Sequence, residues 1–391
     1  MNKVLSYLFT FLVVAFSVIP IFQKNEYLLA GTTVLLVFIL IFKRKRYIEH
    51  NYVWMLLIFF GFLVIQGVVV RSFNFRALSG SATRFLFPFL VLTIYRDKYM
   101  KAFIDIVYAL SIIGLIIFML KNIYYPINGL LLGLSRAIPF NDEGLKHIVV
   151  YGLRQKLHFG FIYSNSGFAN EPGAYAVVLT IALVFTQILN GSLINKKGYV
   201  LILSLLSTFS TAAYVSLIIL LIAFSYEKLI GQKALRGISF IILILIALPF
   251  VVRADFMGSK ISSQIELTED KYETRGRFAS ATADIQLWIT SPIFGIGKGE
   301  DNFDYSVYEM GFGSTHRVNG LANFLAKYGV IVFAAYMIFM YASLKKLFKY
   351  YNLSGFVVFY FAALLSVAFA QACLQWSAYI SLIYLKLAVR K

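Results

Sequence analysis

The chain has 391 residues, of which 60% are hydrophobic and only 14% are charged. This balance excludes an ordinary water-soluble domain, because such domains carry a larger share of charged residues. The formal net charge is +18, but the basic residues form short clusters between apolar runs, and no nucleic-acid-binding module is visible. Short basic loops mark the cytoplasmic side of membrane proteins. We therefore expect the basic residues to contact membrane lipids and not nucleic acid.

Apolar runs long enough to span a bilayer recur along the chain. The first run, from Val4, is interpreted as a retained span because no small-residue cleavage site follows it. The sequence predicts an all-α polytopic membrane protein with a single domain, residues 1–391. The predicted spans are 4–22, 27–43, 52–70, 77–95, 102–120, 172–190, 199–229, 237–253, 321–344, 352–370 and 374–389.

The run 199–229 is too long for one simple span and too short for two full crossings of about 20 residues each. Basic residues both precede it, as at Lys196, and follow it, as at Lys233, so both of its ends are predicted to be cytoplasmic. The polar stretch STFSTAA at 207–213 lies in its middle. We therefore predict a hairpin of two short helices broken there, which gives about 12 transmembrane helices with both termini inside.

This topology leaves two long outward-facing segments, about 121–170 and 254–320, and long loops usually carry function. We expect short helices in these segments to lie across the outer membrane surface. The stretch DIQLWITSPIFG at 284–295 suits such an interfacial helix.

In the first outer segment, Asn170 and Glu171 stand at the head of the span 172–190, where Pro172 suits the first turn of a helix. Glu171 has two possible roles. As a cap, it would balance the positive helix end. Facing a cavity, it would act as a base or orient a sugar hydroxyl, since ionisable residues at membrane depth usually have a function.

In the second outer segment, Arg275 and Arg277 are two residues apart, and their guanidinium groups match phosphate oxygens. Lipid headgroups or nearby acids are the alternative partners. The glycine-rich GIGKG at 295–299 permits close approach of the backbone to a ligand, although it is neither a dinucleotide-binding nor a P-loop signature. His316, followed by Arg317, precedes another span, and histidine serves as a general base near neutral pH.

Arg84 lies about two turns inside a predicted span. Its side chain either extends outward to the interface or faces a cavity and holds phosphate. The sequence leaves both interpretations open.

Three stretches in this order resemble the O-antigen polymerase and ligase superfamily, Wzy-type polymerases above all. They are SGFANEPGAYA, RFASATADIQLWITSPIFGIGKG and THRVNGLANFLAKYGVIVF, and STFSTAAYVSLIILL is similar to the broken-helix region of the family. Family members often have an arginine just before the first glycine, whereas this chain reads FIYSNSG. In this chain, Arg154, His158 or another segment would make the phosphate contact of that arginine.

The resemblance implies a metal-independent, GT-C-like glycosyltransferase without a cofactor, in the bacterial cytoplasmic (inner) membrane and with its active site facing the periplasm or outside. Its substrates would be undecaprenyl-diphosphate-linked glycans, as donor and as acceptor. The enzyme would transfer the growing chain from its lipid diphosphate to the non-reducing end of another lipid-linked repeat unit. A chain-length regulator and a flippase are possible partners.

Roles for the candidate residues follow from this reaction. Arginines stabilise the diphosphate leaving group without a metal. A base takes a proton from the acceptor hydroxyl, and we expect His316 in this role, with Glu171 positioning the acceptor sugar. The alternatives are an O-antigen ligase, a related peptidoglycan polymerase, and a flippase or other transporter of lipid-linked oligosaccharides.

Overall fold

The computed structural model describes residues 3–42, 49–71, 73–124, 126–136, 138, 146–153, 157–158, 162–229, 277–297, 319–353 and 357–389. The expected span 237–253 lies outside these residues, and so do the candidate site residues Arg154, Arg275, His316 and Arg317.

The first half of the described chain comprises α1 (Lys3–Val18), α2 (Pro20–Gln23), α3 (Glu26–Phe42), α4 (His50–Val69), α5 (Phe75–Tyr95), α6 (Asp97–Ile123), α7 (Pro126–Arg136) and the antiparallel strands β1 (Leu157–His158) and β2 (Ile162–Tyr163). The second half comprises α8 (Pro172–Asn190), α9 (Lys196–Leu206), α10 (Thr211–Leu229), α13 (Arg277–Thr290), α15 (Gly320–Tyr350), α16 (Val357–Ala370), α17 (Ser377–Ile380) and the 3-10 helix η1 (Ser381–Ala388).

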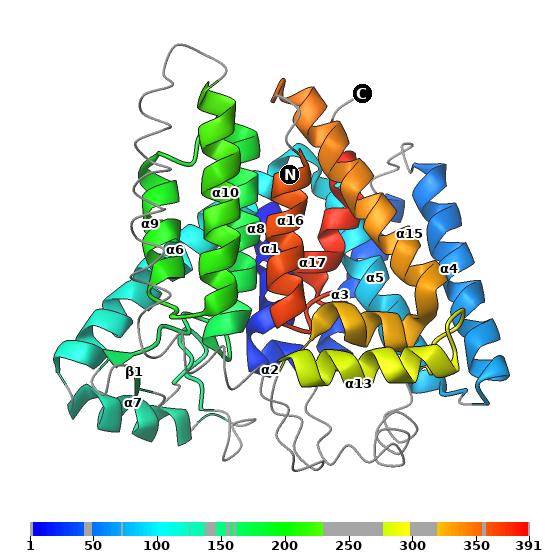
Figure 1. Cartoon of the computed structure of the whole chain (residues 1–391), viewed down its shortest axis with the longest axis horizontal. Coiled ribbons are helices and arrows are strands. Elements are labelled where there is room, and N and C mark those ends of the chain that lie inside the picture. Colours follow the sequence, from blue (N-terminus) through cyan, green and yellow to red (C-terminus); the bar gives the residue numbers. More distant parts are fainter. Residues whose placement is uncertain are drawn as a thin grey trace.

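The long helices stand side by side, and both ends of the chain lie at the same end of this bundle (Figure 1). The short helices α2, α7 and α13 lie at the opposite end, where α7 and α13 run crosswise to the bundle. The long connecting segments thus contain helices, as predicted, and the placement of these helices on the outer membrane surface stays a prediction. For convenience, we call the end that carries α13 the α13 end.

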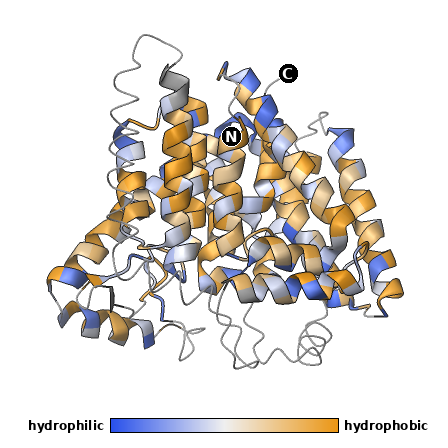
Figure 2. Ribbon diagram, viewed as in Figure 1, coloured by the Kyte–Doolittle hydropathy of each residue, from blue (hydrophilic) through white to orange (hydrophobic). Residues whose placement is uncertain are grey.

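Apolar residues dominate the long helices over most of their length, and hydrophilic residues collect toward the ends (Figure 2). Among the described residues, five helices are long and apolar enough to cross a membrane: α4, α5, α6, α8 and α15. The chain is therefore an all-α membrane protein. The total of about 12 crossings stays a prediction.

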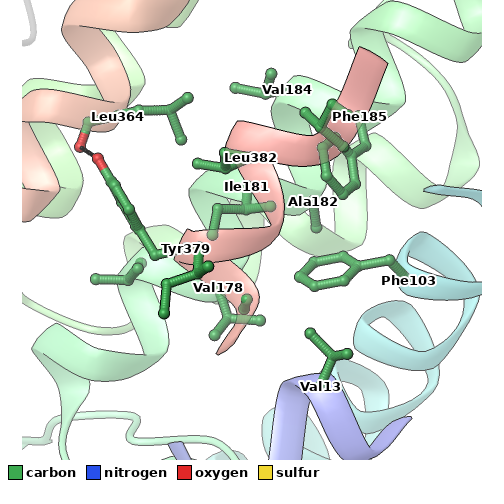
Figure 3. Close-up of a cluster of buried hydrophobic side chains, with 14 of the residues drawn as sticks. Val13, Phe103, Val178, Ile181, Ala182, Val184, Phe185, Leu364, Tyr379 and Leu382 are labelled. Atoms are coloured by element: carbon green, nitrogen blue, oxygen red, sulfur yellow. Dashed lines mark hydrogen bonds between the residues drawn. The ribbon is translucent and has the colours of Figure 1, made fainter. Parts of the chain in front are cut away.

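Helix α8 forms the centre of the bundle, since nearly all of its side chains are buried. Pro172 opens it without needing a backbone hydrogen bond, and Gly191 ends it in the left-handed conformation, with φ 62°. Figure 3 shows Val178, Ile181 and Phe185 of α8 in the core. Side chains from α1, α6, α16 and η1 surround them: Val13, Phe103, Leu364 and Leu382.

Two of the buried tyrosines donate their hydroxyl groups to partners inside this apolar bundle, where an unpaired hydroxyl is costly. The Tyr379 hydroxyl donates to the Leu364 carbonyl at 2.8 Å (Figure 3). The Tyr175 hydroxyl donates to Ser111 Oγ, also at 2.8 Å, which links α8 to α6.

The break in the run 199–229 is confirmed. Helix α9 ends at Leu206 and α10 begins at Thr211, so the polar residues between them interrupt the helix. Two other spans differ from the prediction. The first ends at Val18, because Pro20 removes a backbone donor and starts the separate helix α2. The last is a short α17 continued by the 3-10 helix η1.

Candidate functional site

The α13 end of the bundle contains a cavity of about 160 Å³ that is rich in polar side chains. Its walls come from segments far apart in the sequence: the α1–α3 region, α5, the first turns of α15 and the connection from α16 to α17. The charged residues that line it are Glu26, Arg84 and Lys327, and the amide residues are Gln23, Asn25, Asn323 and Gln375. Trp376 contributes an aromatic side chain to the same wall.

An ion pair lies at one side of the cavity. Arg84 Nη2 is 3.3 Å from Glu26 Oε1, and the Arg84 side chain is only 29% exposed. Arg76 Nε approaches the other carboxylate oxygen of Glu26 at 3.5 Å. Glu26 also lies in the first turn of α3, where the helix end favours a negative charge. Arg84 thus lines a cavity and pairs with Glu26 there, while its binding of phosphate stays a prediction.

Asn323 and Lys327 reach the cavity because α15 changes direction just after them. Gly329 has φ 73° and ψ 174° inside this helix, a conformation that is essentially restricted to glycine. Figure 1 shows the first part of α15 lying beside α13 before the helix turns into the bundle. The kink therefore keeps the first turns of α15 at the α13 end.

The segment that follows α13 holds this kink in place. The Val330 amide donates to the Pro292 carbonyl at 2.9 Å, and the Ile296 amide donates to the Ala326 carbonyl at 2.9 Å. A Cβ at Gly295, whose φ is 70°, would lie 2.6 Å from the Ala326 carbonyl oxygen. Gly295 thus makes a close approach to α15. Lys298 and Gly299 lie outside the described residues, and approach of this stretch to a ligand stays a prediction.

Asn323 carries an unsatisfied donor into the cavity. Its residue is 4% exposed, and its Nδ2 has no hydrogen-bond partner within the described part of the protein. A buried amide without a partner costs about 1–3 kcal/mol. This side chain is therefore well placed to bind an acceptor oxygen of a ligand.

The head of α8 lies at the same end of the bundle. Glu171 occupies the N-cap position and makes no side-chain capping hydrogen bond. Its charge still lies at the positive helix end, so both interpretations of Glu171 stay open. The Asn170 amide donates to the Val18 carbonyl at 3.2 Å, and Asn170 Oδ1 has no hydrogen-bond partner among the described residues. Gly173 permits the side chain of Gln371 to pack directly against this helix start.

A buried histidine supports the segment that leads to α8. His147 Nε2 lies 3.0 Å from the Phe168 carbonyl oxygen, and the Gly152 amide donates to the Gly167 carbonyl at 2.8 Å. Burial lowers the pKa of His147 to about 4, because a charged imidazolium is costly away from water. His147 is consequently neutral at physiological pH and acts as a structural support.

The remaining sequence-predicted residues are placed only in part. Arg277 is the first residue of α13, and His158 lies in β1, but their side chains are not described. Glu26, Lys327 and Trp376 were not predicted as site residues. Glu26 and Lys327 could have been found from the rule that ionisable residues next to or inside apolar helices usually serve a function.

The described residues contain no group of three or more His, Cys, Asp or Glu side chains that could hold a metal ion. The arrangement instead offers an ion pair, side-chain amides and an aromatic ring, which together can bind and orient a polar molecule.

The fold and the cavity define an all-α membrane protein with a polar pocket at one end of its bundle. The sequence matches no protein-family model. A comparison with curated proteins likewise gives no match.

Proposed function

We propose that the protein polymerises undecaprenyl-diphosphate-linked oligosaccharide repeat units at the outer face of the bacterial cytoplasmic membrane. It transfers the growing glycan from its lipid diphosphate to the non-reducing end of another lipid-linked repeat unit. The protein is then a metal-independent glycosyltransferase. The family resemblance of the sequence supports this reaction, and one structural feature supports the kind of substrate.

That feature is the continuity of a polar and an apolar site along the same two helices. Arg84 of α5 lines the polar cavity, while its neighbour Phe85 lines an apolar groove of about 400 Å³. On α15, Lys327 lines the cavity, and Ile331, one turn later, lines the groove. A substrate with a polar head and a long apolar tail needs adjacent sites of these kinds.

The groove lies on the lipid-facing side of the bundle. Trp54 and Ile58 of α4 line it and are 63% and 70% exposed, as expected for side chains that meet acyl chains. A lipid-linked glycan diffusing in the bilayer can thus bring its tail to the groove from the side. Its polar head then reaches the α13 end without crossing the apolar core.

The chemical step requires a stabilised diphosphate and a base. We assign the diphosphate to arginines of the second outer segment, with Arg277 as the principal contact and Arg275 and Arg317 in support. We assign the proton transfer to His316 and the positioning of the acceptor sugar to Glu171. The activities of the Glu171→Gln and His316→Ala variants test these two roles. A dead Glu171→Gln protein beside a nearly normal His316→Ala protein, both binding donor, would reverse the assignment.

Deletion of the gene in its own bacterium tests the proposed function. A polymerase leaves single repeat units on the outer surface, because flipping and ligation continue while chain growth stops. Accumulation of lipid-linked repeat units on the cytoplasmic side would instead indicate a flippase. Normal-length glycan that remains on its lipid carrier would indicate a ligase.

A further inference from the structure

We propose that the polar cavity is a subsite for a single neutral sugar ring, with Trp376 as its aromatic wall and Asn323 and Gln375 as hydrogen-bonding groups. This inference rests on the proposed function for its biological meaning, but it is argued from the cavity itself.

The size of the cavity limits its occupant. At about 160 Å³, it is well below the roughly 300–1,000 Å³ of pockets that enclose drug-sized ligands. One monosaccharide fits this space, and an oligosaccharide does not. Further sugars of a repeat unit would extend out of the cavity at the α13 end.

The Arg84–Glu26 pair favours a neutral occupant on its side of the cavity, and Lys327, the third charged residue of the lining, can donate to a hydroxyl group as well as to an anion. Glu26 already balances Arg84 at 3.3 Å, with Arg76 on its other oxygen at 3.5 Å. An anion would have to compete with this carboxylate for Arg84 and would be repelled by it. A hydroxyl group, by contrast, can donate to Glu26 and accept from Arg84 without breaking the pair.

The uncharged polar groups match a sugar equally well. Side-chain amides both donate and accept hydrogen bonds, as hydroxyl groups do. Asn323 Nδ2 is buried and without a partner in the described structure, so a hydroxyl oxygen supplies the acceptor that this donor lacks. Gln375 and Gln23 add donors and acceptors around the same space.

Trp376 provides a fixed apolar surface for the C–H face of a sugar ring. It is half-buried and lines the cavity. Its amide donates to the Cys373 carbonyl at 2.9 Å, and its carbonyl accepts from Tyr379 and Ile380 at 2.9 and 2.8 Å. These backbone bonds hold the residue in position before any ligand arrives, which lowers the entropic cost of binding.

Tryptophan fluorescence gives a direct test, because the chain has three tryptophans. Replacing Trp54 and Trp288 by Phe leaves Trp376 as the only reporter. The purified double variant is titrated with methyl glycosides of neutral hexoses, 6-deoxyhexoses and N-acetylhexosamines. A methyl hexuronide and inorganic pyrophosphate serve as anionic comparisons. We expect a saturable change in Trp376 emission with at least one neutral glycoside.

Variants locate the binding. Asn323→Leu and Gln375→Ala should each lower the affinity for the sugar about threefold to tenfold, which is the effect of losing one hydrogen bond. Asn190→Leu is the matched control, since Asn190 is exposed at the end of α8 away from Pro172, and it should leave sugar binding unchanged. If Asn323→Leu fails to fold, Gln375→Ala carries the comparison.

The proposal is overturned if no neutral glycoside gives a saturable change, if only the anionic probes do, or if both cavity variants bind like the control. The test separates this subsite from the proposed function. Sugar binding without any chain growth contradicts the polymerase alone. Chain growth at the normal rate without sugar binding contradicts the subsite alone.

Discussion

Replacing Gly329 by alanine should displace the first turns of α15 and weaken both the fold and the cavity. With φ 73° and ψ 174°, this residue occupies a region that costs other residues about 1–3 kcal/mol. A Cβ there would also overlap the Ile293 carbonyl oxygen and lie 2.7 Å from the Phe294 carbonyl carbon. Overpacking of this kind adds about 1–3 kcal/mol. The expected loss of stability is therefore about 2–6 kcal/mol.

The assay is the fraction of purified protein that stays monodisperse in detergent after heating, measured over a temperature series. Gly61→Ala is the matched control, because nothing lies within 4 Å of a Cβ at Gly61 in α4 and alanine favours a helix by about 1 kcal/mol over glycine. Gly329→Ala should aggregate at a clearly lower temperature, and Gly61→Ala should equal or exceed the natural protein. Equal stability of Gly329→Ala and the natural protein would refute the account of the kink.

The other predictions concern an acid-sensitive support, the topology and the diphosphate contact. Because the pKa of His147 falls to about 4 in the fold from about 6.5 in the unfolded chain, the unfolded state takes up the proton first. The protein then loses stability as the pH falls from about 6.5 to 4, by up to about 3 kcal/mol. His147→Gln should remove this pH dependence of the free energy of unfolding. An unchanged pH dependence in the variant would contradict the proposed role of His147. Cysteines placed at Lys196, which is exposed, and at Lys233 should both be labelled from the cytoplasmic side. Labelling from opposite sides would refute the hairpin topology. The natural Cys373 should not interfere with the labelling, because it is fully buried. The Arg277→Ala protein should insert and fold normally but lose polymerisation. Arg277→Lys should restore little activity, because lysine lacks the bidentate fork of arginine. Full activity of the Arg277→Ala protein would exclude Arg277 from the mechanism.

Local sequence patterns predicted the elements of the bundle well. The span 172–190 coincides with α8, because Pro172 and the uninterrupted apolar run define its start and its course. The break inside 199–229 was predicted from polar residues in an apolar run and lies at that place. Such features depend on neighbours in the chain, which a sequence shows directly.

The kink and the cavity depend on distant contacts, and the sequence did not reveal them. Gly329 lies inside the predicted span 321–344, where a lone glycine is compatible with a straight helix; only its contact with the segment after α13 explains the bend. The cavity joins Glu26, Arg84, Lys327 and Trp376. Of these, only Arg84 was a candidate. Glu26 and Lys327 could have been singled out individually as ionisable residues beside apolar runs, but no local pattern shows that the four residues share a cavity.

The most direct test of the proposed function uses purified protein in lipid vesicles with one substrate, the undecaprenyl-diphosphate-linked repeat unit, and no nucleotide sugar or metal ion. The products are separated by length on a gel. Our account predicts a ladder of glycans that grow by whole repeat units, with release of undecaprenyl diphosphate. Repeat units that stay single in the presence of folded, substrate-binding protein would contradict it.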